Sequence, residues 1–336
     1  MNLDDISLSI YSFGYAAGFI RDERPEAAAP TIGILNLPDV ATRHGLGGIE
    51  FPIDRYFSLS ALEQAEAFIA GVRRRGLRVA IDLEQFDPSY ILATLPVLAR
   101  QELGFARIKM ATWYGGNRYL EPSFGQQVRA FTAGLQVLEP QLRAHRVRLL
   151  IENHQDLGAD DLLRIIAEIS SEWIGVNWDI GNSLAVLDTP ESFLRKAAQF
   201  IGNVHLKDYR VVQRQTGFAL CRCALGDGVV DFAGVLADLA RQHGVVPMTI
   251  ELGAQLARQA DVFTKAYWQA YPPCPTSEMA EFFGFIARHA RSADGGESAW
   301  ERRLSGQAII DSEMKELERS VTFLRRLELD RQPALA

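Results

Sequence analysis

The chain has 336 residues, a length that suits one large α/β barrel or two modest domains. Hydrophobic residues make up 48% and charged residues 23%, which excludes a disordered or collagen-like chain. The 35 basic and 42 acidic residues give a net charge of -7 and form no long basic cluster, so no nucleic-acid partner is expected.

The cysteines and the hydropathy pattern indicate the compartment. The three cysteines, Cys221, Cys223 and Cys274, are an odd number in a long chain and do not form a disulfide framework. The Cys-x-Cys spacing is also too short for a usual structural zinc site. Residues 1–5 are polar and acidic, unlike a signal peptide, and no apolar run approaches the ~20 residues of a membrane span. We therefore expect a cytoplasmic protein with no membrane partner.

Eight short apolar runs, rich in β-branched residues, predict eight strands. In chain order they are residues 6–10, 48–51, 77–83, 105–111, 147–152, 174–179, 203–206 and 246–252. Segments with helical spacing of apolar residues lie between them, at 60–75, 160–170, 190–200, 231–243 and 311–327. Ser60 and Glu63 have the spacing of a capping box, and Gly244 is a typical helix end.

Strands that alternate with helices indicate a parallel barrel or a doubly wound sheet. The count of eight, and the repeated order of helix, glycine and strand, favour a (β/α)8 TIM barrel formed by residues 1–336 as one domain. No glycine-rich phosphate loop follows the first strand, and Gly226-Asp227-Gly228 is interpreted as a turn.

Three connections, at 11–36, 209–230 and 253–305, are too long for plain barrel turns. In a barrel all three would leave from the carboxyl ends of strands, the face that carries chemistry. The largest gives a helical, aromatic-rich insertion at 254–305, between strand eight and helix eight. We expect its rings to cover the pocket, to pack on a second copy of the chain, or both, which predicts a homodimer or higher homo-oligomer.

The last four predicted barrel strands each end at a polar residue. These residues are Glu152, Asp179, His205 and Glu251. Three carboxylates and one imidazole that converge at one barrel mouth would repel one another if unpaired, and a divalent cation resolves this. An oxygen-rich donor set with one nitrogen suits Mn²⁺, with Mg²⁺, Co²⁺ or Zn²⁺ as alternatives. A ligand carboxylate with a free oxygen can also move a proton on a bound substrate.

The chain resembles the xylose isomerase-like TIM barrels, the sugar phosphate isomerase/epimerase family. The resemblance rests on Ile-Glu152-Asn153-His154, Asp179-Ile-Gly181-Asn182, Val204-His205-Leu206-Lys207-Asp208 and Ile250-Glu251. It implies a (β/α)8 barrel with one divalent metal held by Glu152, Asp179, His205 and Glu251. In the family's epimerases the two glutamates flank the substrate carbon and exchange its proton, and residues matching His154 and Lys207 approach substrate oxygens. The resemblance thus implies Glu152, Glu251, His154 and Lys207 as catalytic residues.

Further candidates for substrate binding stand beside these motifs. Lys109 lies near the end of strand four and would polarise a substrate oxygen or bind a carboxylate, unless it pairs with Glu50 or Glu84. Trp113 follows the same strand and would form part of an apolar wall, and Asn182 belongs to the motif after strand six.

Three functions remain open at this stage. The first is a divalent-metal-dependent isomerase or epimerase of a keto-sugar, polyol or sugar acid that transfers a proton through a stabilised enediolate. The second is a metal-dependent lyase on an oxidised sugar, which uses the same enediolate but loses a group by dehydration, decarboxylation or carbon–carbon or C-glycosidic cleavage. The third is a non-catalytic sugar-binding barrel, against which the two glutamates argue. All three have a small carbohydrate as the partner.

Overall fold

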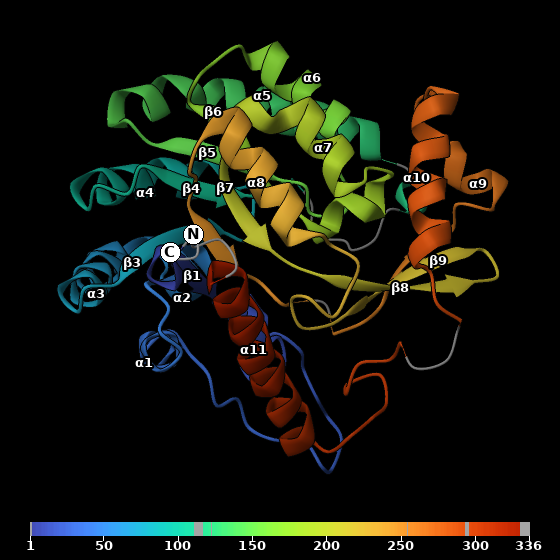
Figure 1. Cartoon of the computed structure of the whole chain (residues 1–336). Helices are drawn as coiled ribbons and strands as arrows, with labels where there is room; N and C mark the ends of the chain where they lie inside the picture. Colours follow the sequence, from blue (N-terminus) through green and yellow to red (C-terminus); the bar gives the residue numbers. More distant parts are fainter. Residues whose placement is uncertain (1, 111–116, 122, 254, 293–295, 330–336) are drawn as a thin grey trace, which may run out of the picture.

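The computed structural model describes residues 2–110, 117–121, 123–253, 255–292 and 296–329. Its centre is a closed barrel of eight parallel strands, each hydrogen-bonded to the next barrel strand along the chain (Figure 1). The strands are β1 (Ile6–Ser9), β2 (Gly48–Pro52), β3 (Arg78–Leu83), β4 (Phe105–Ile108), β5 (Arg148–Glu152), β6 (Ile174–Asp179), β7 (Ile201–Leu206) and β10 (Met248–Ile250). The predicted (β/α)8 barrel is therefore confirmed, with each strand close to its expected position.

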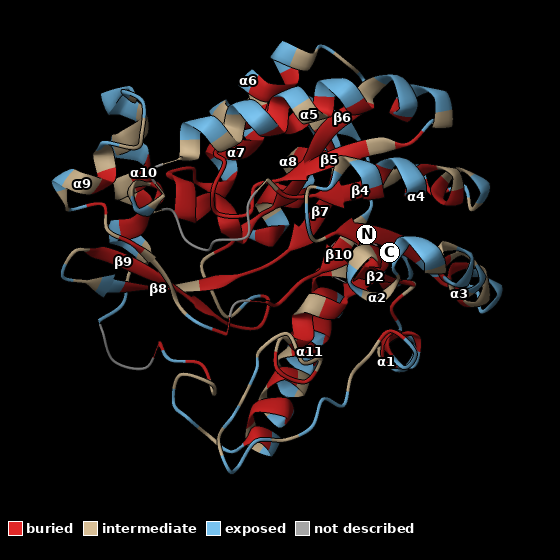
Figure 2. Ribbon diagram, turned by 180° about the vertical axis from the view of Figure 1, so that it is seen from behind, coloured by how far each residue is buried: buried red, intermediate tan, exposed pale blue. Residues whose placement is uncertain are grey.

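Helices surround the barrel and bury one face against it. They are α1 (Leu37–Arg43), α2 (Ile53–Tyr56), α3 (Leu62–Arg74), α4 (Pro88–Arg100), α5 (Phe124–His145), α6 (Ala159–Ile169), α7 (Pro190–Ala197), α8 (Phe232–His243) and α11 (Gly306–Leu329). Short 3-10 helices lie at Leu3–Asp5, Ile10–Phe13, Leu59–Ala61, Arg118–Leu120, Gly181–Val186 and Ala198–Phe200. In Figure 2 the barrel strands are mostly buried, while the helices alternate buried and exposed surface, as amphipathic helices do. No helix in the described ranges is both long and apolar enough to cross a membrane.

The helix ends match their predicted chemistry at one site and differ at another. The Asp231 side chain accepts a hydrogen bond from the Gly234 N–H and starts α8, which ends at Gly244 with φ +94°. The capping box predicted at Ser60 is wrong. The chain forms a 3-10 turn over Leu59–Ala61, and α3 then begins at Leu62 without a side-chain cap.

Two of the long connections join to form an accessory sheet at the carboxyl ends of the barrel strands. The connection after β7 is a hairpin of β8 (Tyr209–Arg214) and β9 (Gly217–Arg222), and β11 (Arg258–Ala260) from the insertion pairs antiparallel with β9. The insertion also contains α9 (Lys265–Trp268) and α10 (Thr276–His289), as its predicted helical character requires. The hairpin and β11 were not predicted.

Most aromatic rings of the insertion lie in a second hydrophobic core, between α10 and the accessory sheet. Its buried members are Leu184, Ala185, Leu187, Tyr209, Val211, Phe218, Leu220, Ala260, Val262, Tyr267, Phe282, Phe285 and Ile286. Most rings of the insertion thus bury their surface against the hairpin of the same chain, an arrangement absent from the sequence-based expectation. The homo-oligomer stays a prediction, and this burial removes the reason first given for it.

The loop after the hairpin is fixed by one carboxylate. The Asp208 side chain accepts hydrogen bonds from the N–H groups of Gly226, Gly228, Val229 and Val230. A Cβ atom at Gly228 would lie only 2.1 Å from an Asp208 oxygen, so glycine is required there. The predicted turn at 226–228 therefore closes around the residue that directly follows Lys207.

Candidate active site

The four polar residues at the ends of the last barrel strands meet at one point. Glu152 and Asp179 are the last residues of β5 and β6, His205 lies within β7, and Glu251 directly follows β10. All four are buried, and each offers a ligand atom within 4.8 Å of those of the others. Two ligands on opposite sides of an ion with bonds of ~2.2 Å would lie about 4.4 Å apart, so the spacing fits a single cation.

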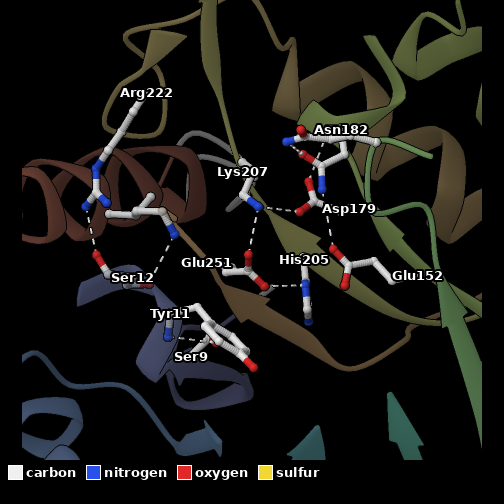
Figure 3. A network of polar contacts seen from close by, with 12 residues as sticks. Ser9, Tyr11, Ser12, Glu152, Asp179, Asn182, His205, Lys207, Arg222 and Glu251 are labelled. Atoms are coloured by element: carbon white, nitrogen blue, oxygen red, sulfur yellow. Dashed lines mark hydrogen bonds and ion pairs between the residues drawn. The ribbon is translucent and has the colours of Figure 1, made fainter. Parts of the chain in front are cut away.

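Direct contacts link these residues into one network (Figure 3). The Lys207 ammonium lies 2.7 Å from both Asp179 Oδ2 and Glu251 Oε1. The other Glu251 oxygen lies 2.8 Å from His205 Nδ1, and Glu50 Oε2 at the centre of β2 lies 3.1 Å from His205 Nε2. Glu50 therefore holds the Nε2 side of the imidazole ring, and the opposite nitrogen, Nδ1, faces Glu251 of the four-residue cluster.

Arg107 in β4, between β3 and β5, extends the network to a further pair of strands. Its guanidinium forms ion pairs with Asp82 in β3 and with Glu152, and all three side chains are buried. Asn182 donates a hydrogen bond of 3.3 Å to the other oxygen of Glu152. Sequence reasoning missed Arg107, although an arginine at an inward position of an apolar strand is a usable signal, because a buried guanidinium requires carboxylate partners.

The charges of this network leave room for a cation. Five carboxylates belong to it, namely those of Glu50, Asp82, Glu152, Asp179 and Glu251. The fixed positive charges of Arg107 and Lys207 leave three negative charges when His205 is neutral. Burial lowers the pKa of His205, but Glu50 and Glu251 outweigh this effect and raise it to about 10. In the metal-free site the imidazole is therefore protonated on both nitrogens. A divalent cation would displace one of these protons and would neutralise two of the three negative charges.

A cavity of about 220 Å³ opens beside the network. Its volume is below the roughly 300–1,000 Å³ of pockets for drug-sized ligands, so it suits a small metabolite. Its lining residues are Tyr11, Gly14, Phe19, Ile20, Arg107, Lys109, His154, Gln155, Lys207, Glu251, Gly253, Gln255, Leu256 and Arg258. The last three come from the insertion, which thus forms part of the cavity wall.

The predicted substrate-binding residues separate into three groups. His154, Lys207 and Lys109 line the cavity. Asn182 is buried beside Glu152, and its Oδ1 accepts hydrogen bonds from Gln155 and Tyr209, so it supports the site from behind. Trp113 lies outside the described residues.

Two lining residues carry unusual electrostatics. Burial, together with the nearby cations Lys109, Arg107 and Lys207, holds the pKa of His154 well below its usual range, so its imidazole is neutral near pH 7. Among the described residues Lys109 forms no ion pair with Glu50 or Glu84, and these two carboxylates contact His205 and Arg55 instead.

Comparison with known proteins gives the same picture of the fold. The family model of the xylose isomerase-like TIM barrel matches residues 38–263. A curated relative, 3-oxo-isoapionate decarboxylase of Pectobacterium atrosepticum, is 24% identical over 233 residues, which cover 68% of this chain and 78% of the relative.

Solved structures of sugar epimerases share this architecture. An L-ribulose 3-epimerase superposes with a TM-score of 0.53 at 17% identity, covering 98% of this chain and 99% of its own. The 3-keto-D-glucoside 4-epimerase YcjR of E. coli gives a TM-score of 0.52 at 15% identity, covering 84% of this chain and 99% of its own. At these identities the likeness establishes the fold alone.

Proposed function

The chain belongs to the xylose isomerase-like TIM-barrel family, and we propose that it is a metal-dependent enzyme that moves a proton next to a carbonyl of a small carbohydrate. Glu152, Asp179, His205 and Glu251 would hold one divalent cation, with Mn²⁺ as the expected ion and Mg²⁺, Co²⁺ or Zn²⁺ as alternatives. Such a cation polarises a carbonyl and stabilises negative charge on its oxygen.

The observation that carries this proposal is the position of Glu251. Its carboxylate belongs to the four-residue cluster and also lines the cavity, so it can reach a substrate carbon held next to the cation. Burial raises the pKa of Glu251, but Lys207 and His205 outweigh this and hold the pKa well below its usual range. The side chain is therefore ionised and ready to accept a proton.

The first reaction step then follows from ordinary carbonyl chemistry. Glu251 takes the proton of the carbon beside the carbonyl, and the electron pair of the broken C–H bond moves to form an enediolate. Lys207, 2.7 Å from Glu251, donates to the oxygen that gains charge. Neutral His154 in the same cavity provides a second group for hydrogen bonding to a substrate hydroxyl.

Whether the enediolate is reprotonated by a second carboxylate depends on Glu152. In an isomerase or epimerase a second group must return the proton, and for inversion it must act from the opposite face of the carbon. Glu152 is the candidate from the family resemblance, yet here Arg107 and Asn182 bind both of its oxygens, and it does not line the described cavity. With both oxygens engaged and no place in the cavity wall, Glu152 has no direct access to a substrate carbon in this cavity.

This ion pair favours a second candidate, a lyase that works with one base. In decarboxylation the C–C bond to the carboxylate breaks and carbon dioxide leaves. The electron pair of that bond forms the enediolate, and one proton then returns to the carbon. In dehydration Glu251 removes the proton beside the carbonyl, the C–O bond to the hydroxyl on the next carbon breaks, and the protonated Glu251 gives its proton to that hydroxyl, which leaves as water. The decarboxylase relative adds weight to this candidate. A non-catalytic barrel would have no use for Glu251 in this position.

The test is a reaction screen followed by proton NMR in deuterated water. Protein loaded with Mn²⁺ would be incubated with keto-sugars and with sugar acids. Deuterium incorporation with an intact carbon skeleton would identify the isomerase or epimerase, and loss of carbon dioxide or water would identify the lyase. If no substrate shows exchange or loss under conditions where metal is bound, the proposed function is wrong.

A further inference from the structure

Lys109 directly follows β4 and is a buried lysine that forms no ion pair within 4 Å in the described part of the chain. Its exposed fraction is 4%, and it lines the cavity. Its one described side-chain contact is with the Tyr11 ring, whose centroid lies 5.7 Å from Nζ. Burial of a charge without an ion pair is costly, and a cation–π contact returns only part of that cost. The position is therefore unusual for a residue that serves folding alone.

The neighbouring cations show what distinguishes Lys109. Arg107 lines the same cavity, and its guanidinium carbon also lies 5.7 Å from the Tyr11 ring, but it forms ion pairs with Asp82 and Glu152. Lys207 is similarly engaged by Asp179 and Glu251. Burial, followed by the charge of Arg107, lowers the pKa of Lys109, and the charges of Asp82, Glu84 and Glu251 oppose this only in part. An anion beside Lys109 would oppose both effects and restore its full charge.

We propose that the cavity binds a sugar acid and that Lys109 is the residue that binds its carboxylate. The inference rests on the proposed function for the carbohydrate part of the ligand, while the acidic group is inferred from Lys109 and its surroundings. With the carbonyl end of the substrate at Glu251, the carboxylate lies towards β4 and the Tyr11 ring. Lys109 is then a specificity-determining residue that selects acids over neutral keto-sugars.

The charge count favours a carboxylate over a phosphate. One buried ammonium lacks an ion pair among the described residues, and it matches the single negative charge of a carboxylate. A phosphate monoester carries about −1.5 to −2 charges at pH 7 and is usually held by several donors, often backbone N–H groups at a helix N-terminus. The cavity that contains Lys109 is lined mainly by side chains at and after barrel strand ends and in the insertion, and no long helix of the described chain begins at it.

The experiment compares ligands that share one carbon skeleton. Calorimetry on the full chain loaded with Mn²⁺ would measure the binding of D-fructose, its C6 acid D-fructuronate and D-fructose 6-phosphate, with 2-keto-D-gluconate as an acid at the other end. A hydrogen bond to a charged partner should make one of the acids bind roughly 10- to 100-fold tighter than D-fructose. Lys109→Met should abolish this preference, and Lys109→Arg should retain part of it. Lys315→Met, which removes an exposed lysine of α11, should leave the preference unchanged.

Each outcome decides the inference. Equal binding of acids and D-fructose by the wild-type protein would overturn it, as would an acid preference that survives in Lys109→Met. Tightest binding of the phosphate would overturn the choice of carboxylate. If Lys109→Met does not fold, Lys109→Gln replaces it, and the wild-type comparison decides by itself.

Because binding is measured without turnover, an acid preference in a protein that shows no proton exchange would reject the proposed function and keep this inference. Exchange on neutral keto-sugars without an acid preference would do the reverse.

Discussion

The Lys207 ammonium lies 2.7 Å from Glu251 Oε1, on the carboxylate that is shared by the four-residue cluster and the cavity (Figure 3). The other Glu251 oxygen contacts His205. Each oxygen of this carboxylate thus has its own cationic or hydrogen-bonding neighbour, which keeps Glu251 ionised and fixes its direction. A proton acceptor in a buried site requires both conditions.

Replacement of this acceptor should therefore remove most of the activity. Glu251→Gln keeps an oxygen ligand but loses the base, and loss of a general base typically costs ~10²–10⁴-fold in rate. The measurement is kcat on the substrate found in the screen, with metal content determined on the same sample. Turnover near the wild-type value, with metal still bound, would contradict the role of Glu251.

Glu152→Gln separates the two candidate reactions. A two-base epimerase should lose activity to a similar degree as Glu251→Gln. In a one-base lyase, Glu152 helps to hold the cation and accepts the ion pair of Arg107, so the rate should fall much less once metal is saturating. The comparison of kcat for the two Gln variants at high metal concentration therefore reports how many carboxylates transfer protons.

The four-residue cluster should bind one divalent cation per chain. Asp179→Ala removes a ligand and leaves Lys207 without one of its two carboxylate partners, so metal content should fall steeply. Elemental analysis after dialysis against Mn²⁺ measures this. Asp238→Ala is the matched control, because Asp238 pairs with Arg241 on the surface of α8. Equal metal content in wild type and Asp179→Ala, with activity indifferent to a chelator, would exclude the site.

Metal binding should also depend on pH through His205. Its pKa is about 10 in the metal-free chain, so the imidazole carries a proton at pH 7–9 that the cation must displace. Affinity should then rise with pH over this window, by up to about tenfold per unit for one released proton. Calorimetry in two buffers of different ionisation enthalpy would count the proton. Glu50→Gln removes one of the carboxylates that raise this pKa and should reduce the release. Affinity that does not change with pH would show that His205 is neutral before the ion binds.

Much of the candidate site was predictable because the sequence shows the apolar spacing of strands and of helices in alternation, and this alternation defines where each strand ends. Alternating strands and helices specify the barrel, and a polar residue at the carboxyl end of a barrel strand must lie at the mouth. Glu152, Asp179, His205 and Glu251 follow from this argument without any knowledge of side-chain contacts. Their convergence depends on strand order, which the sequence pattern contains.

The remaining features depend on contacts between segments far apart in the chain. The ion pairs of Arg107 join β3, β4 and β5, and no local pattern at residue 107 indicates which carboxylates it meets. β11 has three residues and becomes a strand because β9 offers an open edge. The capping box at Ser60 failed for a local reason, since the chain forms an exposed 3-10 turn there and the Ser60 hydroxyl hydrogen-bonds to that of Ser58.

The accessory sheet should contribute to ligand binding independently of the metal site. Phe282 of α10 is buried in the second hydrophobic core and contacts the Phe218 ring of β9 at a centroid distance of 5.9 Å. Phe→Ala substitutions in a core typically cost ~3–5 kcal/mol, so Phe282→Ala should loosen the packing of α10 on the sheet. Since β11 belongs to that sheet and carries Arg258 on the cavity wall, substrate affinity should fall. Metal affinity should stay at the wild-type value, because all four candidate ligands lie at barrel strand ends.

Phe263→Ala is the matched control, since Phe263 is 62% exposed in the same insertion and its replacement should change neither stability nor substrate affinity. Thermal unfolding and calorimetry with metal and with substrate would measure all three effects. If Phe282→Ala lowers stability but leaves substrate affinity intact, the accessory sheet supports only itself, and the cavity wall is held in place by the barrel alone.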